Sequence, residues 1–504
     1  MSKNLFDLFE QNVNKTPEKT AIVHDKKHLT YQELFRDVKT LSAHLHHKGV
    51  TKNTHLAIIA NNSIEFVTIM LSCAYLGATI VPLPLTLKNE RLVKALRRSD
   101  CDFAIGWFTT ISYLAENNIF NNDKLIAMGK KAGNCDFYDD FFHKHAAFSI
   151  SDSVPPDTNY ILTMTSGSTG DPKPIIFTQK TKINRSIIAT KEIYDLNDND
   201  TVLVSTPLYH SLALRSVLLP LLIGGTAILL TKFTAKNWVD AVEKHNVTFL
   251  FAVSTQLEAI THYMQENTYN LNSLNTIISS SALLKQNIKE KLLNIFNCTI
   301  YECYGTSEVG VVSHLKVKEM MGSVGKALPY VDLKIKNGEI LCKTLTAFEG
   351  YYKNEEATQK AHDEEGYFRT GDLGTLDKNG FLFYQGRTKD VIITGAINVY
   401  PKDIEDLINE FEEVEDCAVI GIENEHFGEI IVACMTEKDN YSIKIPDIQK
   451  ACLKHLTDYQ MPQKFKIVKS FPKSGLGKIL KNDLKKMVVN EERKVGKFNC
   501  GTTS

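Results

Sequence analysis

One loop-forming segment of the chain has the composition of a phosphate-binding site. It reads Thr165-Ser166-Gly167-Ser168-Thr169-Gly170-Asp171-Pro172-Lys173 and stands between two β-like runs, Tyr160–Met164 and Ile175–Thr178. Small residues let backbone N–H groups approach phosphate oxygens, hydroxyl groups donate hydrogen bonds to them, and Lys173 adds a positive charge. The segment lacks the Gly-Lys-Ser/Thr ending of the common phosphate-binding loop. A Ser/Thr/Gly loop that stands alone is more often a flexible turn, so its function depends on the motifs that accompany it.

The segment belongs to a series of motifs whose order and separation resemble those of the acyl-adenylate-forming enzymes. This family comprises the acyl- and aryl-CoA ligases, firefly luciferase and the adenylation domains of peptide synthetases. The resemblance covers nearly the whole chain, from Thr30-Tyr31-Gln32-Glu33-Leu34 to Gly477-Lys478. It implies that the chain activates a carboxylic acid with ATP. It also implies that the loop closes over the β- and γ-phosphates of ATP through Thr165, Ser166, Gly167, Ser168, Thr169, Gly170 and Lys173.

The resemblance assigns the other ATP contacts to three further motifs. In Tyr304-Gly305-Thr306-Ser307-Glu308 the tyrosine is expected to pack on adenine, with Gly305 and Thr306 beside it, and Glu308 is expected to bind Mg²⁺. A single carboxylate makes a weak Mg²⁺ site, but substrate phosphates normally supply the other ligands. In Thr370-Gly371-Asp372 the aspartate is expected to accept hydrogen bonds from the ribose hydroxyls. Arg387 is expected to make a second contact to ribose or phosphate.

Two residues are predicted to act at the reacting carboxylate of the acid. The segment Pro207-Leu208-Tyr209-His210-Ser211 resembles the family segment that places His210 beside this group. The segment from Pro472 to Lys478 resembles the family's mobile loop, whose final lysine bridges the carboxylate and the α-phosphate of ATP. Attack of a carboxylate on a phosphate brings two anions together, and a preorganised ammonium group lowers that repulsion. His210, Glu308 and Lys478 are therefore the predicted catalytic residues.

The acyl pocket departs from the usual pattern of the family. Ser279-Ser280-Ser281-Ala282-Leu283 replaces the usual Gly-Gly-Ala-Pro strand end, so Ser280, Ser281 and Ala282 are predicted to line the pocket together with His210. Two Gly-to-Ser changes add bulk and hydroxyl groups, which predicts a narrower or more polar pocket. Arg215 leaves two interpretations open: it pairs with a second carboxylate on the substrate, or it pairs structurally within the protein.

The segment after Gly386 resembles the CoA-ligase form of the family. It runs through Lys389, the expected hinge, to Gly395, which is expected on the thiol side of the site. Peptide-synthetase domains use an Asp near the His210 position to bind an amino group, and none stands there in this chain. The resemblance therefore implies ATP, Mg²⁺ and CoA as cofactors and a fatty or aryl acid without an α-amine as substrate. In two steps the acid forms acyl-AMP and pyrophosphate, and the CoA thiol then displaces AMP.

Two other functions remain open from the residues alone. Ala396-Ile397 replaces the common Gly-Gly or Gly-Glu, so the acceptor thiol is either CoA or the phosphopantetheine of an acyl carrier protein. A non-catalytic nucleotide-binding relative is the other alternative. The joint presence of Lys478 and Glu308 argues against it, because a binding module needs neither residue.

The pattern of elements predicts an α/β fold with two domains. Helices alternate with apolar strands from residue 30 to about 300, as buried parallel strands require. Short alternating runs between 328 and 386 predict an antiparallel, β-barrel-like section. With the resemblance, this implies a large N-terminal domain of stacked mixed sheets and helices (1–388), and a small mobile α+β C-terminal domain (389–504). The boundary is predicted at the turn Gly386-Arg387-Thr388-Lys389.

Composition excludes several classes of protein. The 504 residues are 43% hydrophobic, and a net charge of −1 with no long basic run argues against a nucleic-acid partner. Ten cysteines without C-x-x-C or zinc-like spacing predict reduced thiols in a cytoplasmic protein. The uncharged run Phe66–Leu85 is long enough to span a membrane, but Gly77, Pro82 and Pro84 interrupt it. A buried helix that ends near Gly77 and a buried strand, Thr79–Leu83, are predicted instead.

Overall fold

The computed structural model describes residues 3–143, 153–164, 173–320, 322–394, 397–424, 426–474 and 477–499, the last eight by their backbone alone. The chain forms two compact units. Unit 1 consists of residues 1–321, 327–332 and 343–366, and unit 2 of residues 322–326, 333–342 and 367–504. The predicted boundary at 388/389 falls inside unit 2, and as the position of a hinge it remains a prediction.

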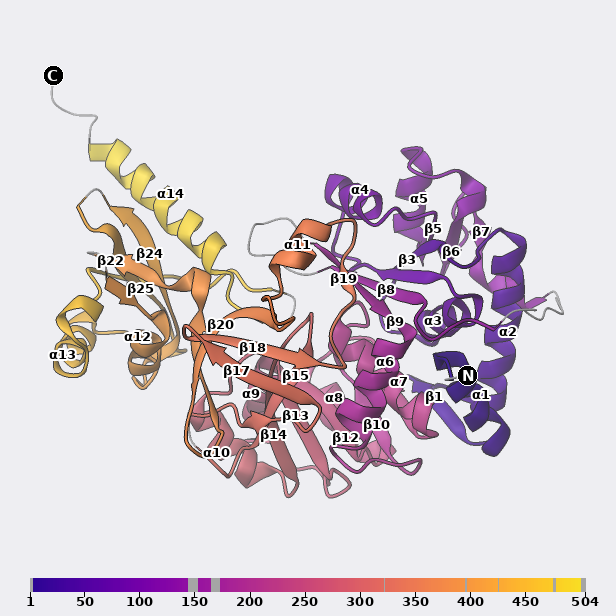
Figure 1. Cartoon of the computed structure of the whole chain (residues 1–504), viewed down its shortest axis with the longest axis horizontal. Coiled ribbons are helices and arrows are strands. Elements are labelled where there is room, and N and C mark those ends of the chain that lie inside the picture. Colours follow the sequence, from indigo (N-terminus) through magenta and orange to yellow (C-terminus); the bar gives the residue numbers. More distant parts are fainter. Residues whose placement is uncertain are drawn as a thin grey trace. The chain divides into compact units, whose positions relative to one another are not determined.

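Unit 1 contains two sheets built mainly from parallel strands, as the helix–strand alternation predicts (Figure 1). In the first sheet the central strand, β12 (Phe249–Val253), is buried along its whole length, which explains its uninterrupted apolar sequence. In strand order this sheet contains β16 (Lys326–Ala327), β15 (Gly310–Lys316), β14 (Thr299–Thr306), β13 (Thr276–Ser280), β12, β10 (Thr201–Val204), β11 (Thr226–Leu229), β1 (Thr20–His24) and β2 (Lys27–Thr30). The second contains β19 (Gly350–Tyr351), β9 (Pro174–Thr178), β8 (Asn159–Met164), β4 (Thr79–Pro82), β3 (His55–Ile59), β5 (Phe103–Trp107), β6 (Leu125–Met128) and β7 (Asp136–Phe137).

The helices of unit 1 cover these sheets and bury their apolar faces. They are α1 (Leu5–Lys15), α2 (Tyr31–His47), α3 (Ile64–Leu76), α4 (Asn89–Arg98), α5 (Phe108–Glu116), α6 (Gln179–Ser186), α7 (Ser211–Ile223), α8 (Ala235–His245), α9 (Ser254–Tyr263), α10 (Gln286–Ile295) and α11 (Glu355–Lys360). The uncharged run after Phe66 is helix α3, closed by Gly77 in the left-handed conformation, followed by strand β4, as predicted. Among the described residues no helix is long and apolar enough to cross a membrane.

Unit 2 contains the predicted antiparallel section and a smaller α+β part. The first is the sheet β17 (Val331–Lys336), β18 (Glu339–Thr344), β20 (Phe368–Leu376) and β21 (Leu382–Arg387). The second sheet contains β23 (Ile397–Val399), β22 (Ile392–Thr394), β25 (Gly428–Glu437), β24 (Val414–Asn424) and β26 (Lys464–Ile467). It is accompanied by α12 (Pro401–Ile408), α13 (Ile445–His455) and α14 (Lys481–Asn499). The sequence pattern after Tyr400 predicts a helix over Pro401–Glu412. Helix α12 is shorter, because Asn409 already stands at its C-cap.

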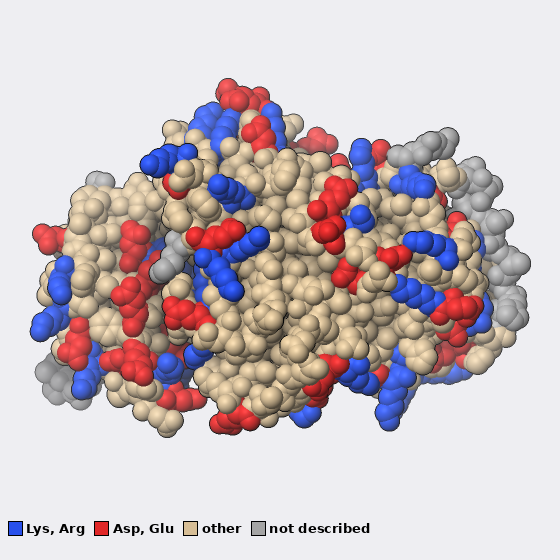
Figure 2. Space-filling model, turned by 90° about the horizontal axis from the view of Figure 1, so that it is seen from below, with Lys and Arg blue, Asp and Glu red and all other residues tan. Residues whose placement is uncertain are grey.

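Charged side chains of both signs are interspersed on the face drawn in Figure 2. Among the residues coloured there, Lys and Arg form no continuous basic surface.

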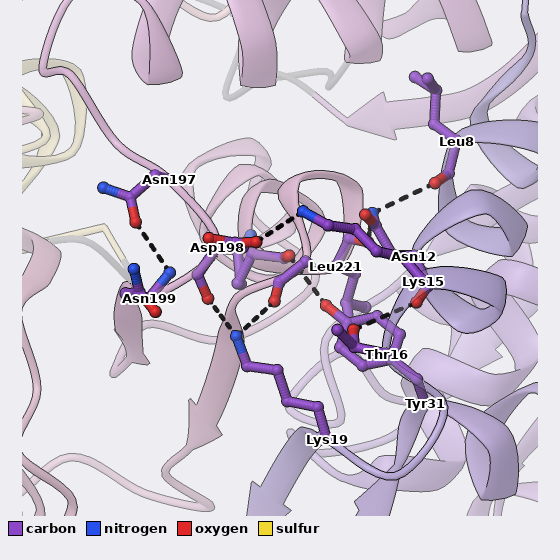
Figure 3. A network of polar contacts seen from close by, with 12 residues as sticks. Leu8, Asn12, Lys15, Thr16, Lys19, Tyr31, Asn197, Asp198, Asn199 and Leu221 are labelled. Atoms are coloured by element: carbon purple, nitrogen blue, oxygen red, sulfur yellow. Dashed lines mark hydrogen bonds and ion pairs between the residues drawn. The ribbon is translucent and has the colours of Figure 1, made fainter.

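A network of polar contacts holds the C-terminal end of α7 against the first helix of the chain (Figure 3). The half-buried Lys19 donates from Nζ to the carbonyl oxygen of Gly224, at 2.7 Å, and to that of Asp198. Asn12 donates from Nδ2 to the Leu221 carbonyl oxygen at 3.1 Å. A cation at this position also interacts favourably with the negative end of the helix dipole. The network thus fixes the far end of the helix that begins directly after His210.

Replacing Lys19 with methionine should lower the free energy of unfolding by about 2–3 kcal/mol, because two half-buried carbonyl oxygens lose their donor. Lys15 is the matched control, since it contacts the Asp198 carboxylate at 2.8 Å but is 65% exposed. Lys15→Met should cost less than about 1 kcal/mol. Urea denaturation of the two variants beside the wild type checks the difference, and equal destabilisation would contradict the role given to Lys19.

Candidate active site

The predicted residues of unit 1 gather at the carboxyl ends of neighbouring parallel strands. Strands β10, β12, β13 and β14 pair in parallel, in that order. His210 lies in the connection from β10 to α7, Ser280 ends β13, and Tyr304 to Thr306 end β14. Crevices outside the carboxyl ends of parallel strands are where open α/β sheets bind ligands. The sheet therefore brings together three motifs that lie at positions 210, 280 and 304–306 of the sequence.

The Tyr304 motif depends on a close approach of two strands. β14 pairs antiparallel with β15, and their register shifts between Tyr304 and Gly305. A Cβ atom at Gly305 would lie 1.9 Å from the carbonyl oxygen of Gly310, so only glycine fits this position. Tyr304 is buried, and the turn after Thr306 leads directly to Glu308.

The backbone and the carboxylate of Glu308 are held by different residues. Arg185 donates from Nη2 to the carbonyl oxygens of Ser307 and Glu308, at 3.1 and 2.9 Å, and the Phe348 N–H donates to the Glu308 carbonyl oxygen at 2.7 Å. The carboxylate oxygen Oε1 accepts from the Tyr351 hydroxyl at 3.4 Å. Burial, reinforced by the negative charge of Glu308, raises the pKa of Tyr351 well above its ordinary value.

Lys173 approaches the same tyrosine. Its Nζ atom lies 5.3 Å from the centre of the Tyr351 ring, and Tyr351 belongs to β19, which pairs with β9 directly after Lys173. One tyrosine thus brings the lysine of the phosphate motif near the predicted Mg²⁺ ligand. Tyr351 was not predicted from the sequence, because no motif marks it. The rest of the predicted loop, Thr165, Ser166, Gly167, Ser168, Thr169 and Gly170, lies outside the described residues.

His210 is a neutral, largely buried imidazole. It stands at the N-cap of α7 without capping the helix through its side chain, and its ring lies 4.3 Å from that of Tyr209. Its Nε2 atom is buried and has no hydrogen-bond partner in the part of the chain that the structure describes. Burial lowers the pKa of His210 to about 4. At neutral pH this ring therefore carries no charge and offers one nitrogen to a bound polar group.

Asp372 and Arg387 form an ion pair in unit 2. They are directly opposite in the register of β20 and β21, and Arg387 Nε lies 3.2 Å from Asp372 Oδ1. The aspartate is only 3% exposed. It follows Gly371, whose φ of +68° favours glycine and whose N–H donates to the Glu339 carboxylate at 3.1 Å. The two predicted ribose-binding residues are thus brought together by strand pairing.

Lys478 lies within electrostatic range of this ion pair. Its loop closes on itself, since the Ser474 N–H donates to the Lys478 carbonyl oxygen at 2.8 Å and the Lys478 N–H donates to Ser474 Oγ at 3.1 Å. The side chain remains accessible to solvent, yet the protein packed around it, and then the positive charge of Arg387, lower the pKa of Lys478 to about 8. Asp372 and Asp390 act in the opposite direction.

The other residues predicted for unit 2 concern the thiol step. Lys389 is exposed and lies in a short 3₁₀ turn, Thr388–Asp390, which connects β21 to β22. The protein packed around part of this side chain, and then the positive charge of Arg387, lower the pKa of Lys389. Gly395 lies outside the described residues.

The predicted acyl-pocket segment has an unusual backbone. Ser280 is half-buried at the end of β13, whereas Ser281 and Ala282 are exposed. Ser281 has a φ of +81°, in the left-handed region that favours glycine. A serine thus occupies a backbone conformation suited to the glycine that the family usually has in this segment.

Replacing Ser281 with glycine should raise the free energy of unfolding by about 0.5–1 kcal/mol, because it relieves the strain of a left-handed non-glycine residue. Ser280→Gly is the matched control. It places glycine in a strand and should lower the stability by about 0.5–1 kcal/mol. Thermal denaturation of both variants measures the two opposite shifts; destabilisation by Ser281→Gly would show that the serine side chain itself holds the segment.

Two family models match the chain. The AMP-binding enzyme family model matches residues 9–352, and the model of the AMP-binding enzyme C-terminal domain matches residues 403–478. The chain is 26% identical to an indoleacetate–CoA ligase of Aromatoleum aromaticum, over 97% of this chain and 98% of that protein. It is 29% identical to a feruloyl-CoA synthase of Amycolatopsis, over 94% and 96%.

The fold matches a solved structure of the same size. The o-succinylbenzoate CoA synthetase of Bacillus subtilis, in complex with its acyl-adenylate intermediate, superposes with a TM-score of 0.85 at 24% identity, covering 96% of this chain and 98% of that one. Because the AMP-binding enzyme model covers more than half of the chain, and its C-terminal companion covers the segment up to Lys478, this chain belongs to the AMP-binding enzyme family.

Proposed function

We propose that the chain is an acid–thiol ligase that converts a carboxylic acid and ATP to acyl-AMP and pyrophosphate, and then transfers the acyl group to CoA with release of AMP. The observation that carries this proposal is the grouping of Lys478 with the Asp372–Arg387 pair in unit 2. A protein that only binds a nucleotide needs a ribose contact, but it needs no lysine held beside it on a self-closed loop.

The adenylation step assigns one role to each described residue. Asp372 would accept hydrogen bonds from the ribose, Arg387 would contact ribose or phosphate, and Tyr304 would pack on adenine. Lys173 would contact the outer phosphates. His210 would offer its unpartnered Nε2 to the acid's carboxylate, and Lys478 would reduce the repulsion between that carboxylate and the α-phosphate.

The carboxylate of Glu308 and the phosphates of ATP are suited to bind Mg²⁺. A carboxylate oxygen is a ligand that Mg²⁺ prefers, and the ion commonly binds through one or two carboxylates together with substrate phosphates. Glu308 would supply a protein carboxylate to the ion, as the family resemblance implies. When bound, the ion would neutralise phosphate charge.

The second step needs an acceptor thiol and a change of conformation. The relatives named as an indoleacetate–CoA ligase and a feruloyl-CoA synthase support CoA as the acceptor. A hinge at Lys389, at the predicted boundary between residues 1–388 and 389–504, would withdraw Lys478 after acyl-AMP has formed. Gly395 would then lie on the thiol side. Movement of a domain between two half-reactions is a recognised way to serve two chemistries at one site.

The decisive experiment measures pyrophosphate release from ATP across a panel of fatty, aryl and dicarboxylic acids, with and without CoA. Release that depends on the acid and turns over faster with CoA is expected. Acid-dependent release that CoA leaves unchanged would point to a carrier-protein thiol as the acceptor. ATP binding without pyrophosphate release for any acid would contradict the ligase function.

A further inference from the structure

Three positively charged side chains are buried close together in unit 1. Lys182 is 1% exposed, Arg185 4% and Arg215 7%. The first two lie on α6, three residues apart and therefore on one face of the helix, and the third lies on α7. The two helices lie side by side (Figure 1).

The three side chains meet around the first turn of α7. Lys182 donates from Nζ to Ser211 Oγ at 3.4 Å, and Arg185 donates from Nη1 to the same oxygen at 3.3 Å. Arg215 stands four residues after Ser211, one helical turn further on the same face. Its guanidinium carbon lies 4.3 Å from the centre of the Phe251 ring. The positive end of the α7 dipole adds to this concentration of charge.

The charges of the cluster formed by Lys182, Arg185 and Arg215 are only partly balanced, by the carboxylate of Glu308, which acts on Arg185. Among the described residues none of the three forms an ion pair, and Arg215 has no hydrogen-bond partner there either. The remaining hydrogen bonds of Arg185 go to carbonyl oxygens of Thr346, Ser307 and Glu308. Burial and the charges of the two arginines lower the pKa of Lys182 well below its ordinary value. Arg215 is a buried cation without a partner among the described residues, which is unfavourable, so the cluster is suited to receive a negatively charged group.

The surroundings of Arg215 are suited to an organic anion. The titratable groups that act on it are Tyr330, Cys303 and Tyr194, with Phe251 beneath its guanidinium group. The three titratable groups are uncharged at neutral pH, because burial raises the pKa of each. The pKa of Cys303 is raised to about 11. Aromatic and thiol groups around one cation are typical of a pocket for a small organic molecule, and less so of a triphosphate site.

The position of the cluster relates it to the reacting carboxylate. The hydroxyl oxygen of Ser211 accepts hydrogen bonds from Lys182 and Arg185. Ser211 directly follows His210, the residue proposed to contact the reacting carboxylate. Four residues of helix span about 6 Å, so Arg215 lies within reach of the far end of a short acid. An acid with a negative charge at each end would satisfy both positions.

We propose that the acid substrate carries a second carboxylate, and that Lys182, Arg185 and Arg215 bind it while the first carboxylate reacts. This inference rests on the proposed ligase function and adds the substrate class to it. It favours the substrate-pairing role for Arg215 over the structural one, and it replaces the hydrophobic fatty or aryl acid by a dicarboxylic acid.

The test compares α,ω-dicarboxylic acids with their monomethyl esters, which keep the chain length and lose one charge. In the wild type, kcat/KM for pyrophosphate release is expected to be about 10²-fold higher for the diacid than for the ester. The ester leaves the buried cations without their anion, and an unpaired buried charge typically lowers binding by one to a few powers of ten. Arg215→Met should lower kcat/KM for the diacid by about 10²-fold and change that for the ester by less than about threefold. Arg215→Lys should restore part of the diacid preference.

The control is Lys180→Met, since Lys180 lies on α6 with Lys182 and Arg185 but is 60% exposed and pairs with Asp157. It should leave both substrates unchanged. An equal loss for diacid and ester in Arg215→Met, or a rise in the KM for ATP with both acids, would overturn the inference and assign the cluster to the phosphates or to folding.

A binding measurement separates this inference from the ligase function. Diacids alone, without ATP, should raise the melting temperature of the wild type and not that of Arg215→Met. Diacid stabilisation without pyrophosphate release would retain the anion site and reject the ligase. Pyrophosphate release with monocarboxylic acids, without any diacid preference in rate or stabilisation, would retain the ligase and reject the anion site.

Discussion

Replacing Lys478 with alanine should lower the rate of acyl-AMP formation by about 10³-fold, because the transition state loses the one group held to reduce the repulsion between carboxylate and phosphate. Thioester formation from supplied acyl-AMP should change by less than about threefold, since that step needs no such bridge. Pyrophosphate release measures the first half-reaction, and consumption of synthetic acyl-AMP by CoA measures the second.

The matched control is Lys473→Ala. Lys473 stands in the same loop, but its Nζ pairs with Asp416 at 3.3 Å, and Lys473 is not among the charges that act on Lys478. Its replacement should leave both half-reactions intact. Equal loss of the two half-reactions in Lys478→Ala would show that the catalytic assignment of Lys478 is wrong.

The pKa of Lys478 gives this prediction a dependence on pH. Because burial and Arg387 lower that pKa to about 8, the ammonium form is present below pH 8 and is lost as the pH rises through that value. The kcat/KM for adenylation, which reports groups of the free enzyme, should therefore fall above about pH 8. In Lys478→Arg this decline should be absent from the residual activity, because a guanidinium group stays protonated over the whole range.

Replacing Lys389 with proline should spare adenylation and slow thioester formation by about 10²-fold or more, the scale of loss that a displaced catalytic geometry produces. Lys389 lies in the 3₁₀ turn Thr388–Asp390, and proline can adopt the φ angle of a 3₁₀ turn. Proline then fixes φ at position 389 and also restricts the backbone angles of the preceding Thr388. A hinge that must change its backbone angles between the two steps would then be locked.

Lys389→Ala is the control, because it removes the same charge and leaves the backbone free. It should sustain both half-reactions within about threefold. If alanine and proline impair the second step equally, the side chain matters and the hinge lies elsewhere. A proline variant that catalyses both steps normally would contradict a hinge at this residue.

The elements that could be predicted are those whose sequence carries its own signal. Helix α3 and strand β4 follow from an uncharged run divided by Gly77, and the antiparallel section follows from short alternating runs. The end of α12 was predicted four residues too late, since apolar and acidic residues after Ile408 continue the helical pattern that Asn409 ends. The residue at which a helix ends depends on local capping, and the hydrophobic pattern of the sequence does not show where capping occurs.

The residues of the candidate site likewise fall into those that the sequence predicts and those that it does not. The family resemblance singled out Tyr304, Glu308, Asp372, Arg387 and Lys478, because each belongs to a short motif that survives without knowledge of the fold. Tyr351, Lys182 and Arg185 belong to no motif, and the one signal for the last two was their spacing by three on an unremarkable helix. Their proximity to Glu308 and Ser211 depends on how distant segments pack.

The family, the order of the motifs and the residues that belong to them can therefore be predicted from the sequence alone, since these are properties of short contiguous segments. Which charges are buried together depends on how the segments pack. Lys182 and Arg215 are 33 positions apart on different helices, and nothing in the composition of either helix indicates that both lose contact with solvent. Burial turns ordinary surface charges into an anion site, because in a low-dielectric interior a cation requires a partner that it does not need in water.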